Sequence, residues 1–384
     1  MHLNHKIALD PTCKQSAYFR RAAGTARFVY NWGLSEWNRQ YVAGRKPSGN
    51  SLQRQFNSMY RELFPWISDV HRDCHSKPLD DLQIAFGNFF AKRADGPTFK
   101  KKGVDRASFY VAGDRITVSG KIVILPRIGK VRMREALRFN GKINHARVVE
   151  ECGRWFVCIS VDVGEYHKEI TGYGTVGIDL GMKTLATLST GETIENPRPL
   201  RKAQARLRRA SRKLHRRVKS SANRNKQRQV IAKIHRRIRN IRHDGLHKLT
   251  TRLCRQNQTV VIEDLNASGM VKNHRLAQSI SDVGFGLFRK MLTYKAEIFG
   301  TLVVVADRFY PSSKTCSSCG LVKDVLSLGE RIFACECGLS IDRDLNAALN
   351  LRSLGQAMPE VTATDMPSGV DEVATIPCSP LSTL

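Results

Sequence analysis

Three acidic residues stand at positions where they could share divalent metal ions, although they are far apart along the chain. Asp179 and Glu263 each end an apolar run typical of a buried strand, and Asp344 lies at the start of a helical segment. Phosphodiester hydrolysis uses clustered carboxylates, because two divalent ions roughly 3.5–4 Å apart activate water and stabilise the leaving oxygen. We therefore predict that Asp179, Glu263 and Asp344 form a catalytic site for Mg²⁺ or Mn²⁺, which prefer oxygen ligands.

Each of these acids, taken alone, is a weak signal of a metal site. An Asp beside a Gly often only forms a turn. The segment Gly177-Ile-Asp-Leu-Gly181 is also similar to the metal-binding strand of actin-like and sugar-kinase ATPases. Against that alternative, the sequence contains no second glycine-rich phosphate loop, and a formal charge of +29 far exceeds what a small nucleotide needs. The three acids together favour a nuclease built on a ribonuclease-H-like α/β sheet.

Four cysteines in two close pairs form a second candidate metal site. Two residues separate Cys316 from Cys319, one residue separates Cys335 from Cys337, and a Gly follows each pair. The second pair is one residue shorter than the usual spacing. Thiolates suit Zn²⁺, and four of them close its coordination shell, which is typical of a structural site. We predict a zinc ribbon here and buried thiols rather than disulfides at the other six cysteines.

The chain is strongly basic, with 63 Lys and Arg against 34 Asp and Glu. This balance attracts polyanions, of which nucleic acid is the leading candidate. Residues 201–248 hold 19 Lys or Arg and one acid, Asp244, and their apolar residues recur at heptad spacing. We predict an antiparallel helical hairpin that turns near 220–225; a merely solvated face would mix both signs of charge. The candidate nucleic-acid contacts are Lys100, Lys101, Lys102, Arg208, Arg209, Arg212, Arg216, Arg217, Arg236 and Arg237.

The hydrophobic pattern divides the chain into parts. Residues 14–90 have helical periodicity, and short strand-like runs follow from 108 to 161, which is typical of a small barrel or sandwich. An α/β pattern begins near 172, with strands expected at 176–181, 259–265 and 302–305 and a helix at 285–299. The Pro-, Ser- and Thr-rich tail is expected to be disordered. No signal-peptide core or bilayer-length apolar run is found, so a cytoplasmic location is expected.

Aromatic residues alternate with basic ones in two N-terminal segments. These are Tyr18-Phe-Arg-Arg21 and Phe28-Val-Tyr-Asn-Trp32. Such residues could stack on nucleic-acid bases. At helical spacing they are more typical of core packing, which is the interpretation we prefer.

Seven motifs, in order along the chain, match one protein family. On these residues, from near 5 to about 352, the chain resembles the TnpB (OrfB) proteins of bacterial insertion sequences, relatives of the type V CRISPR effector nucleases. The last four motifs are highly specific in combination. The motifs are Ala26-Arg-Phe-Val-Tyr-Asn-Trp32, Ala85-Phe-Gly-Asn-Phe-Phe90, Pro97-Thr-Phe-Lys-Lys-Lys102, Gly177-Ile-Asp-Leu-Gly181, Val261-Ile-Glu-Asp-Leu265, Ser313-Lys-Thr-Cys-Ser-Ser-Cys-Gly320 and Asp342-Arg-Asp-Leu-Asn-Ala-Ala348.

The resemblance implies a domain plan. Residues 1–170 would form a wedge β-barrel with a helical recognition insert at about 11–100. Residues 171–352 would form a RuvC-like nuclease domain with the basic hairpin at 199–250 and the zinc ribbon at 312–340. Residues 353–384 would be the disordered tail.

The resemblance also assigns roles and partners. Asp179, Glu263 and Asp344 match the catalytic triad, with Asp344 chosen over Asp342 because it lies two residues before the Asn-Ala-Ala motif. The implied cofactors are structural Zn²⁺, catalytic Mg²⁺ or Mn²⁺, and a guide RNA transcribed from the transposon end. The implied partner is double-stranded target DNA that carries a short adjacent motif. The resemblance also implies that the protein is associated with the nucleoid and is compatible with a monomer.

The leading hypothesis is therefore a transposon-encoded, RNA-guided DNA endonuclease. One alternative is a transposase that joins strands, although the sequence has no tyrosine or serine recombinase signature. Another is a transposition accessory protein or regulator that binds nucleic acid without cleaving it. Cleavage that is lost on replacement of Asp179 by Ala separates the first hypothesis from the non-cleaving binder. Strand transfer by the purified protein alone would favour the transposase.

Overall fold

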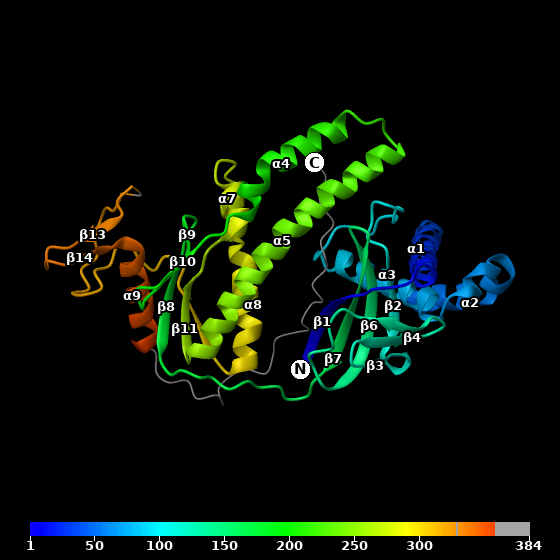
Figure 1. The fold of residues 1–384 in the computed structure, drawn as a ribbon, viewed down its shortest axis with the longest axis horizontal. Coiled ribbons are helices and arrows are strands. Elements are labelled where there is room, and N and C mark those ends of the chain that lie inside the picture. Colours follow the sequence, from blue (N-terminus) through cyan, green and yellow to red (C-terminus); the bar gives the residue numbers. More distant parts are fainter. Residues whose placement is uncertain (328, 358–384) are drawn as a thin grey trace. The chain divides into compact units, whose positions relative to one another are not determined.

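The computed structural model describes residues 1–327 and 329–357. It divides into two compact units, one of Met1–Glu165 and one that begins at Tyr166 (Figure 1). Within the described residues, we find no helix with both the length and the apolar character needed to cross a membrane. The part of the predicted tail from position 358 onwards lies outside the described residues.

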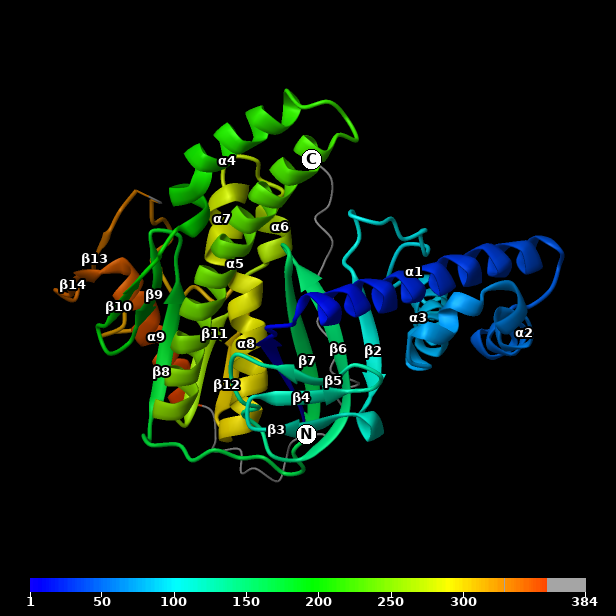
Figure 2. The same ribbon diagram turned by 45° about the vertical axis from the view of Figure 1, so that its right-hand side comes forward.

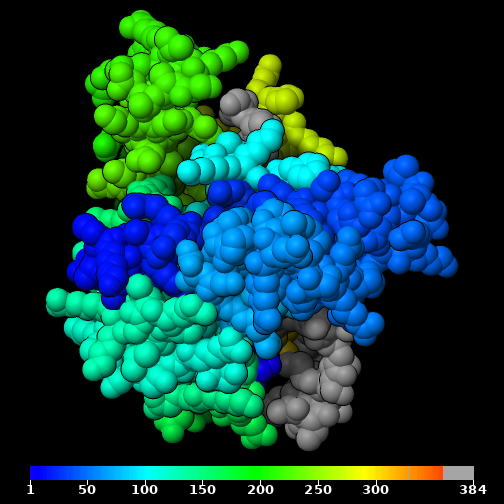
Figure 3. Space-filling view, turned by 90° about the vertical axis from the view of Figure 1, so that its right-hand side faces the viewer, coloured from blue at the N-terminus to red at the C-terminus, as the bar shows by residue number. Residues whose placement is uncertain are grey.

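Helices form one part of unit 1. The helix α1 begins with a capping box, in which the Gln15 N–H donates to the Thr12 hydroxyl and the Thr12 N–H donates to the Gln15 side chain. Figure 3 shows the blue helical residues packed against the cyan and green strands of the same unit. The helical elements are α1 (Cys13–Val42), α2 (Gly49–Leu63), η1 (Pro65–Asp69), α3 (Asp73–Phe90) and the short η2 (Gly113–Arg115).

The long helix α1 joins two cores. Near its start, Tyr18 and Phe19 are buried among the strands. Further along, Val29 and Leu34 pack with residues of α2 and α3. Trp32 is partly buried against this second cluster. Core packing, the preferred interpretation of the aromatic segments, is therefore confirmed for these residues.

The strands of unit 1 form two antiparallel sheets that share one hydrophobic core. The four-stranded sheet has the order β1–β7–β6–β2, and the three-stranded sheet has the order β3–β4–β5. The predicted strand at 115–118 begins later, at Thr117, because Gly113–Arg115 forms a 3-10 turn. The strands are β1 (His2–Ala8), β2 (Ser108–Ala112), β3 (Thr117–Ser119), β4 (Ile122–Leu125), β5 (Gly129–Arg132), β6 (Lys142–Glu151) and β7 (Arg154–Asp162).

Unit 2 contains a five-stranded mixed sheet with the order β10–β9–β8–β11–β12 (Figure 2). The first three strands along the chain are antiparallel, and β11 and β12 then join as parallel strands. This is the ribonuclease-H-like arrangement that the sequence predicted. The strands are β8 (Thr175–Leu180), β9 (Thr184–Leu188), β10 (Thr193–Glu195), β11 (Thr259–Glu263) and β12 (Leu302–Ala306).

The helices of unit 2 include the predicted basic hairpin, formed by α4 and α5. Its turn comes earlier than predicted, because Ser221 caps α5 by accepting a hydrogen bond from the Arg224 N–H. The helix at 285–299 has the predicted bounds, whereas the short helices α6 and α7 were not predicted. The helices are α4 (Pro199–His215), α5 (Ala222–Gln256), α6 (Ala267–Val271), α7 (Ala277–Val283), α8 (Phe285–Phe299) and α9 (Arg343–Ala357).

A buried acid anchors the hairpin to α7. Asp282 is 4% exposed and accepts hydrogen bonds from the backbone N–H groups of Leu200 (2.9 Å) and Arg201 (3.0 Å) at the start of α4. Arg242 of α5 donates to the Asp282 carbonyl at 2.9 Å. Pro199 begins α4 and has no N–H of its own, so Asp282 serves the first free donors of the helix.

The last helix corrects the predicted start of the tail. Residues 353–357 were assigned to a disordered segment, but α9 continues to Ala357. Leu354 packs against the cluster of Val261, Ala306 and Leu351. The apolar contact with the sheet therefore outweighs the weak helical signal of this stretch.

Candidate active site

Strand pairing places Asp179 and Glu263 side by side at the C-terminal ends of two adjacent inner strands of the unit 2 sheet. The strands β8 and β11 are parallel, and Ile178 pairs with Ile262. The next residues along these strands are Asp179 and Glu263, and both are half-buried. Neighbouring strands lie about 4.8 Å apart, and paired residues point to the same face. The register therefore brings two of the predicted carboxylates together.

Helix α9, which carries Asp344, packs against β8 (Figure 1). Gly177 and Asp179 are two residues apart on β8, so they face the same side of the sheet. A Cβ atom on Gly177 would collide with the backbone of Ala348 and Arg352, so α9 lies directly on that side. Asp344 precedes Ala348 by four residues in α9, and residues four apart share a helix face. The close contact at Gly177 therefore aims Asp344 toward Asp179.

The charges of the three acids act on one another. The pKa of Asp179 is raised from 3.8 to about 8. Burial is the largest cause, and the negative charges of Glu263 and Asp344 follow. Arg343 acts in the opposite direction, and Asp342 adds a smaller rise. The three carboxylates thus form one electrostatic cluster, and the ion pair of Arg343 with Asp344 at 3.5 Å offsets only part of the repulsion.

A hard divalent cation fits this cluster. Carboxylate oxygens are the ligands that Mg²⁺ and Mn²⁺ prefer, and a cation would reverse the repulsion that raises the pKa of Asp179. Among the described residues, only the four cysteines already have their ligand atoms within 4.8 Å of one another.

Without Mg²⁺ or Mn²⁺, Asp179→Asn is expected to stabilise the protein at pH 8. The folded-state pKa is about 8 and the ordinary value is 3.8, so the folded protein holds a proton that the unfolded chain has lost. Stability therefore falls as the pH rises from about 4 to about 8. Asn cannot ionise and removes this cost. Thermal unfolding with zinc retained should give the variant a midpoint about 5 °C above wild type at pH 8 and an equal midpoint at pH 4.

The control for this prediction is Asp95→Asn, which changes an exposed acid in unit 1. It is expected to leave the midpoint unchanged at both pH values. Equal midpoints of Asp179→Asn and wild type at pH 8 would contradict the raised pKa.

The acid that follows Glu263 is neutralised by two arginines. Asp264 pairs with Arg289 at 2.5 Å and with Arg308 at 2.6 Å. Hydrogen bonds from Arg308 and Arg289 lower the pKa of Asp264. Asp264 is therefore held as a structural anion, which separates it from Glu263.

The acid at position 342 caps the helix that bears Asp344. One oxygen of Asp342 accepts hydrogen bonds from the backbone N–H groups of Asp344 (2.9 Å) and Leu345 (3.1 Å). An Asp at this position satisfies free donors at the helix start. Asp342 therefore acts as the N-cap of α9, a role that was not predicted from the sequence.

The four predicted zinc ligands converge in unit 2. The Sγ atoms of Cys316 and Cys337 lie 3.6 Å apart, as do those of Cys319 and Cys335. Tetrahedral Zn²⁺ with Zn–S bonds of about 2.3 Å places its sulfur ligands roughly 3.8 Å apart. The cysteines therefore fit a closed, structural Zn²⁺ site.

The shortened cysteine pair is accommodated by a tight turn. Strands β13 (Ile332–Ala334) and β14 (Ser340–Asp342) are antiparallel, and the pair lies between them. Gly338 adopts a positive φ of 89°, which favours glycine, and its N–H donates to the Cys335 carbonyl at 3.0 Å. A single intervening residue is thus enough to bring both thiols to the site.

Two buried asparagines of α9 tie the zinc ribbon to the carboxylate cluster. The Asn346 amide donates to the Thr315 carbonyl at 2.7 Å, and its oxygen accepts from the Ser317 N–H at 3.0 Å. Asn350 also donates to the Thr315 carbonyl at 2.7 Å. The same helix carries Asp344, so the ribbon and the cluster share one support. In the sequence, the Asn-Ala-Ala motif was the only sign of this shared support.

Replacement of Cys316 by Ser is expected to remove zinc and to destabilise the ribbon. Cys316 is 1% exposed, and an oxygen ligand in its place binds Zn²⁺ poorly. Metal analysis should fall from about one zinc per chain to near zero, with a lower thermal midpoint. Cys13→Ser is the matched control, because Cys13 at the start of α1 is exposed and not buried as predicted. Full zinc content in Cys316→Ser would contradict the assignment.

Most of the predicted nucleic-acid contacts of the hairpin are exposed. Its apolar seam consists of Leu200, Ala203, Leu207 and Ala210 of α4 with Ile231, Ile234 and Ile238 of α5. Arg236 is half-buried and has interactions within the protein. The exposed contacts of the hairpin are Arg208, Arg209, Arg212, Arg216, Arg217 and Arg237, and in unit 1 Lys101 and Lys102 are also exposed.

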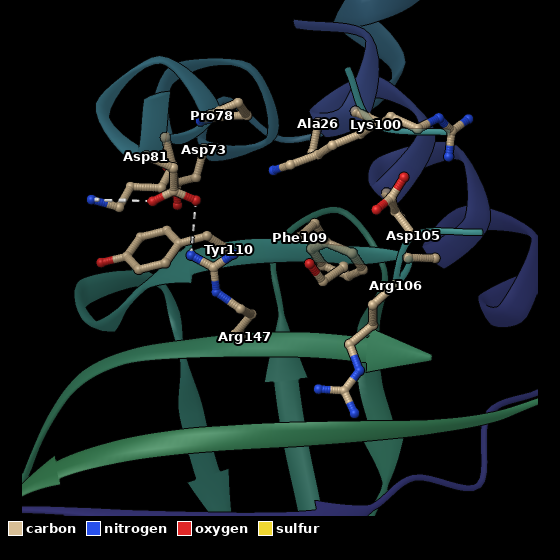
Figure 4. A pocket seen from close by; sticks show the side chains of 15 residues that line it. Ala26, Asp73, Pro78, Asp81, Lys100, Asp105, Arg106, Phe109, Tyr110 and Arg147 are labelled. Carbon is tan, nitrogen blue, oxygen red and sulfur yellow. Dashed lines mark hydrogen bonds and ion pairs between the residues drawn. The ribbon is translucent and has the colours of Figure 1, made fainter. Parts of the chain in front are cut away.

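Lys100 differs from its two neighbours, because it lines a pocket of unit 1 (Figure 4). Its ammonium group lies 3.6 Å from the centroid of the Tyr30 ring, and burial lowers its pKa. In the same pocket, Arg147 donates to Asp81 at 3.0 Å. The cavity is small, at about 40 Å³. Lys100 therefore packs within the unit, and its contact with nucleic acid stays a prediction.

A larger hollow of about 340 Å³ adjoins the turn that follows Asp179. Lys183 and Arg201 line it, and both are exposed. Arg198 also lines it and donates to the Lys183 carbonyl at 2.9 Å. None of these three residues was among the predicted contacts, and Lys183 and Arg198 lie outside the basic run of 201–248.

The unit 2 topology and its clustered carboxylates define a protein with a RuvC-like nuclease fold. A solved Cas12f1–sgRNA–target DNA complex shares this fold, with a TM-score of 0.56 at 15% identity over 89% of this chain and 83% of that one. A family model for OrfB of IS605-type elements, described as "Probable transposase", matches 157–274. A model for the TNB domain of Cas12f1-like proteins matches 285–351.

Full-length relatives show the family. A Streptomyces pristinaespiralis protein is 39% identical over 92% of this chain and 89% of its own length. The Escherichia coli K12 protein InsQ is 33% identical over 92% of both chains. Both are named as candidate RNA-guided DNA endonucleases. The chain belongs to the OrfB (TnpB) family of insertion-sequence proteins, as its motifs predicted.

The name of one matching family model differs from the secondary structure observed in the matched segment. A helix-turn-helix model matches residues 1–46. In the structure this segment is the strand β1 followed by the single helix α1. The apolar residues of α1 pack into two successive hydrophobic cores. This packing explains why one continuous helix stands where the name of the model implies two helices.

Proposed function

We propose that the chain is a transposon-encoded, RNA-guided DNA endonuclease that cleaves target DNA by metal-dependent phosphodiester hydrolysis. The observation that carries this function is the cluster of Asp179, Glu263 and Asp344, in which burial and the neighbouring charges raise the pKa of Asp179 to about 8. The names of the relatives at 39% and 33% identity support it. A non-cleaving binder would not need three converging acids, and the names of the relatives favour an endonuclease over a transposase.

The catalytic assignment follows from the chemistry of the cluster. Asp179, Glu263 and Asp344 would hold Mg²⁺ or Mn²⁺, which supplies an activated water and stabilises the leaving oxygen. Asp342 caps α9 and so holds Asp344 at the sheet edge. Cys316, Cys319, Cys335 and Cys337 would hold Zn²⁺, whose closed shell serves only to support the ribbon.

The domain roles follow the family plan. Unit 1 would be the wedge domain, with its helices as the recognition insert for the short motif beside the target. Unit 2 would be the RuvC-like domain. The basic hairpin of α4 and α5 would contact the backbone of the guide RNA–DNA heteroduplex, because residues 201–248 contain 19 Lys or Arg and only one acid.

RNA that copurifies with the full-length protein tests the guided mechanism. Sequencing is expected to find one discrete RNA from the transposon end. That RNA, redirected to a new sequence, should direct Mg²⁺-dependent cleavage of matched double-stranded DNA beside the adjacent motif. Absence of a discrete RNA would reject guided cleavage, and strand transfer by the protein alone would favour the transposase.

Replacement of Arg208 and Arg212 by Ala is expected to weaken binding of the heteroduplex in a salt-dependent way. The two residues are exposed on the same face of α4, four residues apart. Each lost phosphate contact lowers the slope of log K against log salt by about 1, so the pair should lower it by about 2. Lys290→Ala, an exposed lysine of α8, is the control. An unchanged slope would exclude the hairpin contact.

A further inference from the structure

A buried serine outside the predicted site contacts one of its carboxylates. The Ser312 hydroxyl donates a hydrogen bond of 2.5 Å to Oε1 of Glu263, and only 3% of Ser312 is exposed. The two residues are 49 positions apart, and Ser312 lies between β12 and the first pair of cysteines. A donor to one carboxylate oxygen fixes the orientation of the group and leaves the other oxygen for a cation.

The backbone around Ser312 is itself held in place. Its N–H donates to the Tyr310 carbonyl at 2.8 Å. Its carbonyl accepts a hydrogen bond of 2.8 Å from the amide of Asn350, which is 5% exposed. Asn350 belongs to α9, the helix that carries Asp344. The hydroxyl therefore links Glu263 on the sheet to a support that α9 provides.

We propose that Ser312 is a positioning residue for Glu263 in metal binding, an inference that rests on the proposed nuclease function. A free Glu side chain samples several rotamers, and restricting it costs conformational entropy. The buried hydroxyl restricts Glu263 before a cation arrives. Ser312 thereby raises the affinity of the carboxylate cluster for Mg²⁺ or Mn²⁺ without being a ligand itself.

Manganese binding to the full-length protein, freed of nucleic acid at high salt and with zinc retained, tests this role. The bound Mn²⁺ is measured by electron paramagnetic resonance. Ser312→Ala is expected to weaken Mn²⁺ binding about ten- to hundredfold. The matched control is Ser313→Ala, which changes the neighbouring serine and should keep wild-type affinity. In a Glu263→Gln background, Ser312→Ala should add nothing, because the charged partner is already gone.

Several results would overturn the proposal. One is wild-type Mn²⁺ affinity in Ser312→Ala. Another is an equal further loss in the Glu263→Gln background. A third is a parallel loss of zinc and thermal stability, which would make Ser312 a purely structural residue. The readout needs neither RNA nor cleavage, so a wild-type protein that binds Mn²⁺ but never cleaves a guided target would reject the proposed function separately.

Discussion

Asp344→Asn is expected to lower target cleavage at least about a thousandfold, while guided binding of the target survives. A metal ligand supplies several kcal/mol of transition-state stabilisation, and each 1.36 kcal/mol is about tenfold in rate. Asn keeps the size of Asp but not its charge, so the fold should be unaffected. The measurement is single-turnover cleavage in Mg²⁺ beside a binding assay without divalent ions. Asp179→Ala should behave in the same way.

The matched control is Asp342→Asn, two residues away in the same motif. Asp342 serves as the N-cap of α9, and Asn caps helices about as well as Asp. Its cleavage rate should therefore stay close to wild type. Normal cleavage by Asp344→Asn together with a loss in Asp342→Asn would show that the two acids had been assigned the wrong way round. An equal loss in both variants would show that the role of Asp342 is more than that of a helix cap.

Gly177→Ala is expected to cost about 3 kcal/mol or more of stability and to abolish cleavage. A Cβ atom there would collide with backbone atoms of Ala348 and Arg352 in α9. Backbone cannot give way as a flexible side chain does, so overpacking at this position reaches the upper end of its usual cost. The displaced helix would carry Asp344 away from Asp179. Chemical denaturation and cleavage assays measure the two effects.

Gly245→Ala provides the opposite case in the same unit. Gly245 lies inside α5, and nothing stands within 4 Å of a Cβ placed on it. Alanine should therefore stabilise the helix by about 1 kcal/mol, because it has the higher helix propensity. If Gly177→Ala were as well tolerated as Gly245→Ala, the packing of α9 on β8 would have to be different.

Much of the fold could be predicted because periodicity is a local property. The apolar spacing of 285–299 predicted α8 with its observed bounds. The basic hairpin was also predicted, since its apolar seam repeats along the sequence. The short helices α6 and α7 were missed, because five and seven residues are too few to show a helical period. The last turns of α9 were missed because their stability comes from contact with the sheet.

Supporting residues of the site were harder to predict than its candidate ligands. Asp282, Ser312 and Asn350 have partners tens of residues away, and nothing in their local sequence marks them. Asp342 lay within one of the seven motifs, yet its role as a helix cap required the backbone geometry of α9. A side chain that acts through a distant partner carries no local pattern.

The sequence by itself determined the chemistry that this protein can perform. Hard carboxylates, soft thiolates and a formal charge of +29 favour divalent metals and a polyanionic partner, because affinity depends on residue type. Only the tertiary structure decided which acids stand together. The register of β8 with β11 and the close approach of α9 at Gly177 bring three charges into one half-buried cluster. Asp264 and Asp342 carry the same carboxyl group, but two arginines and a helix start already engage it.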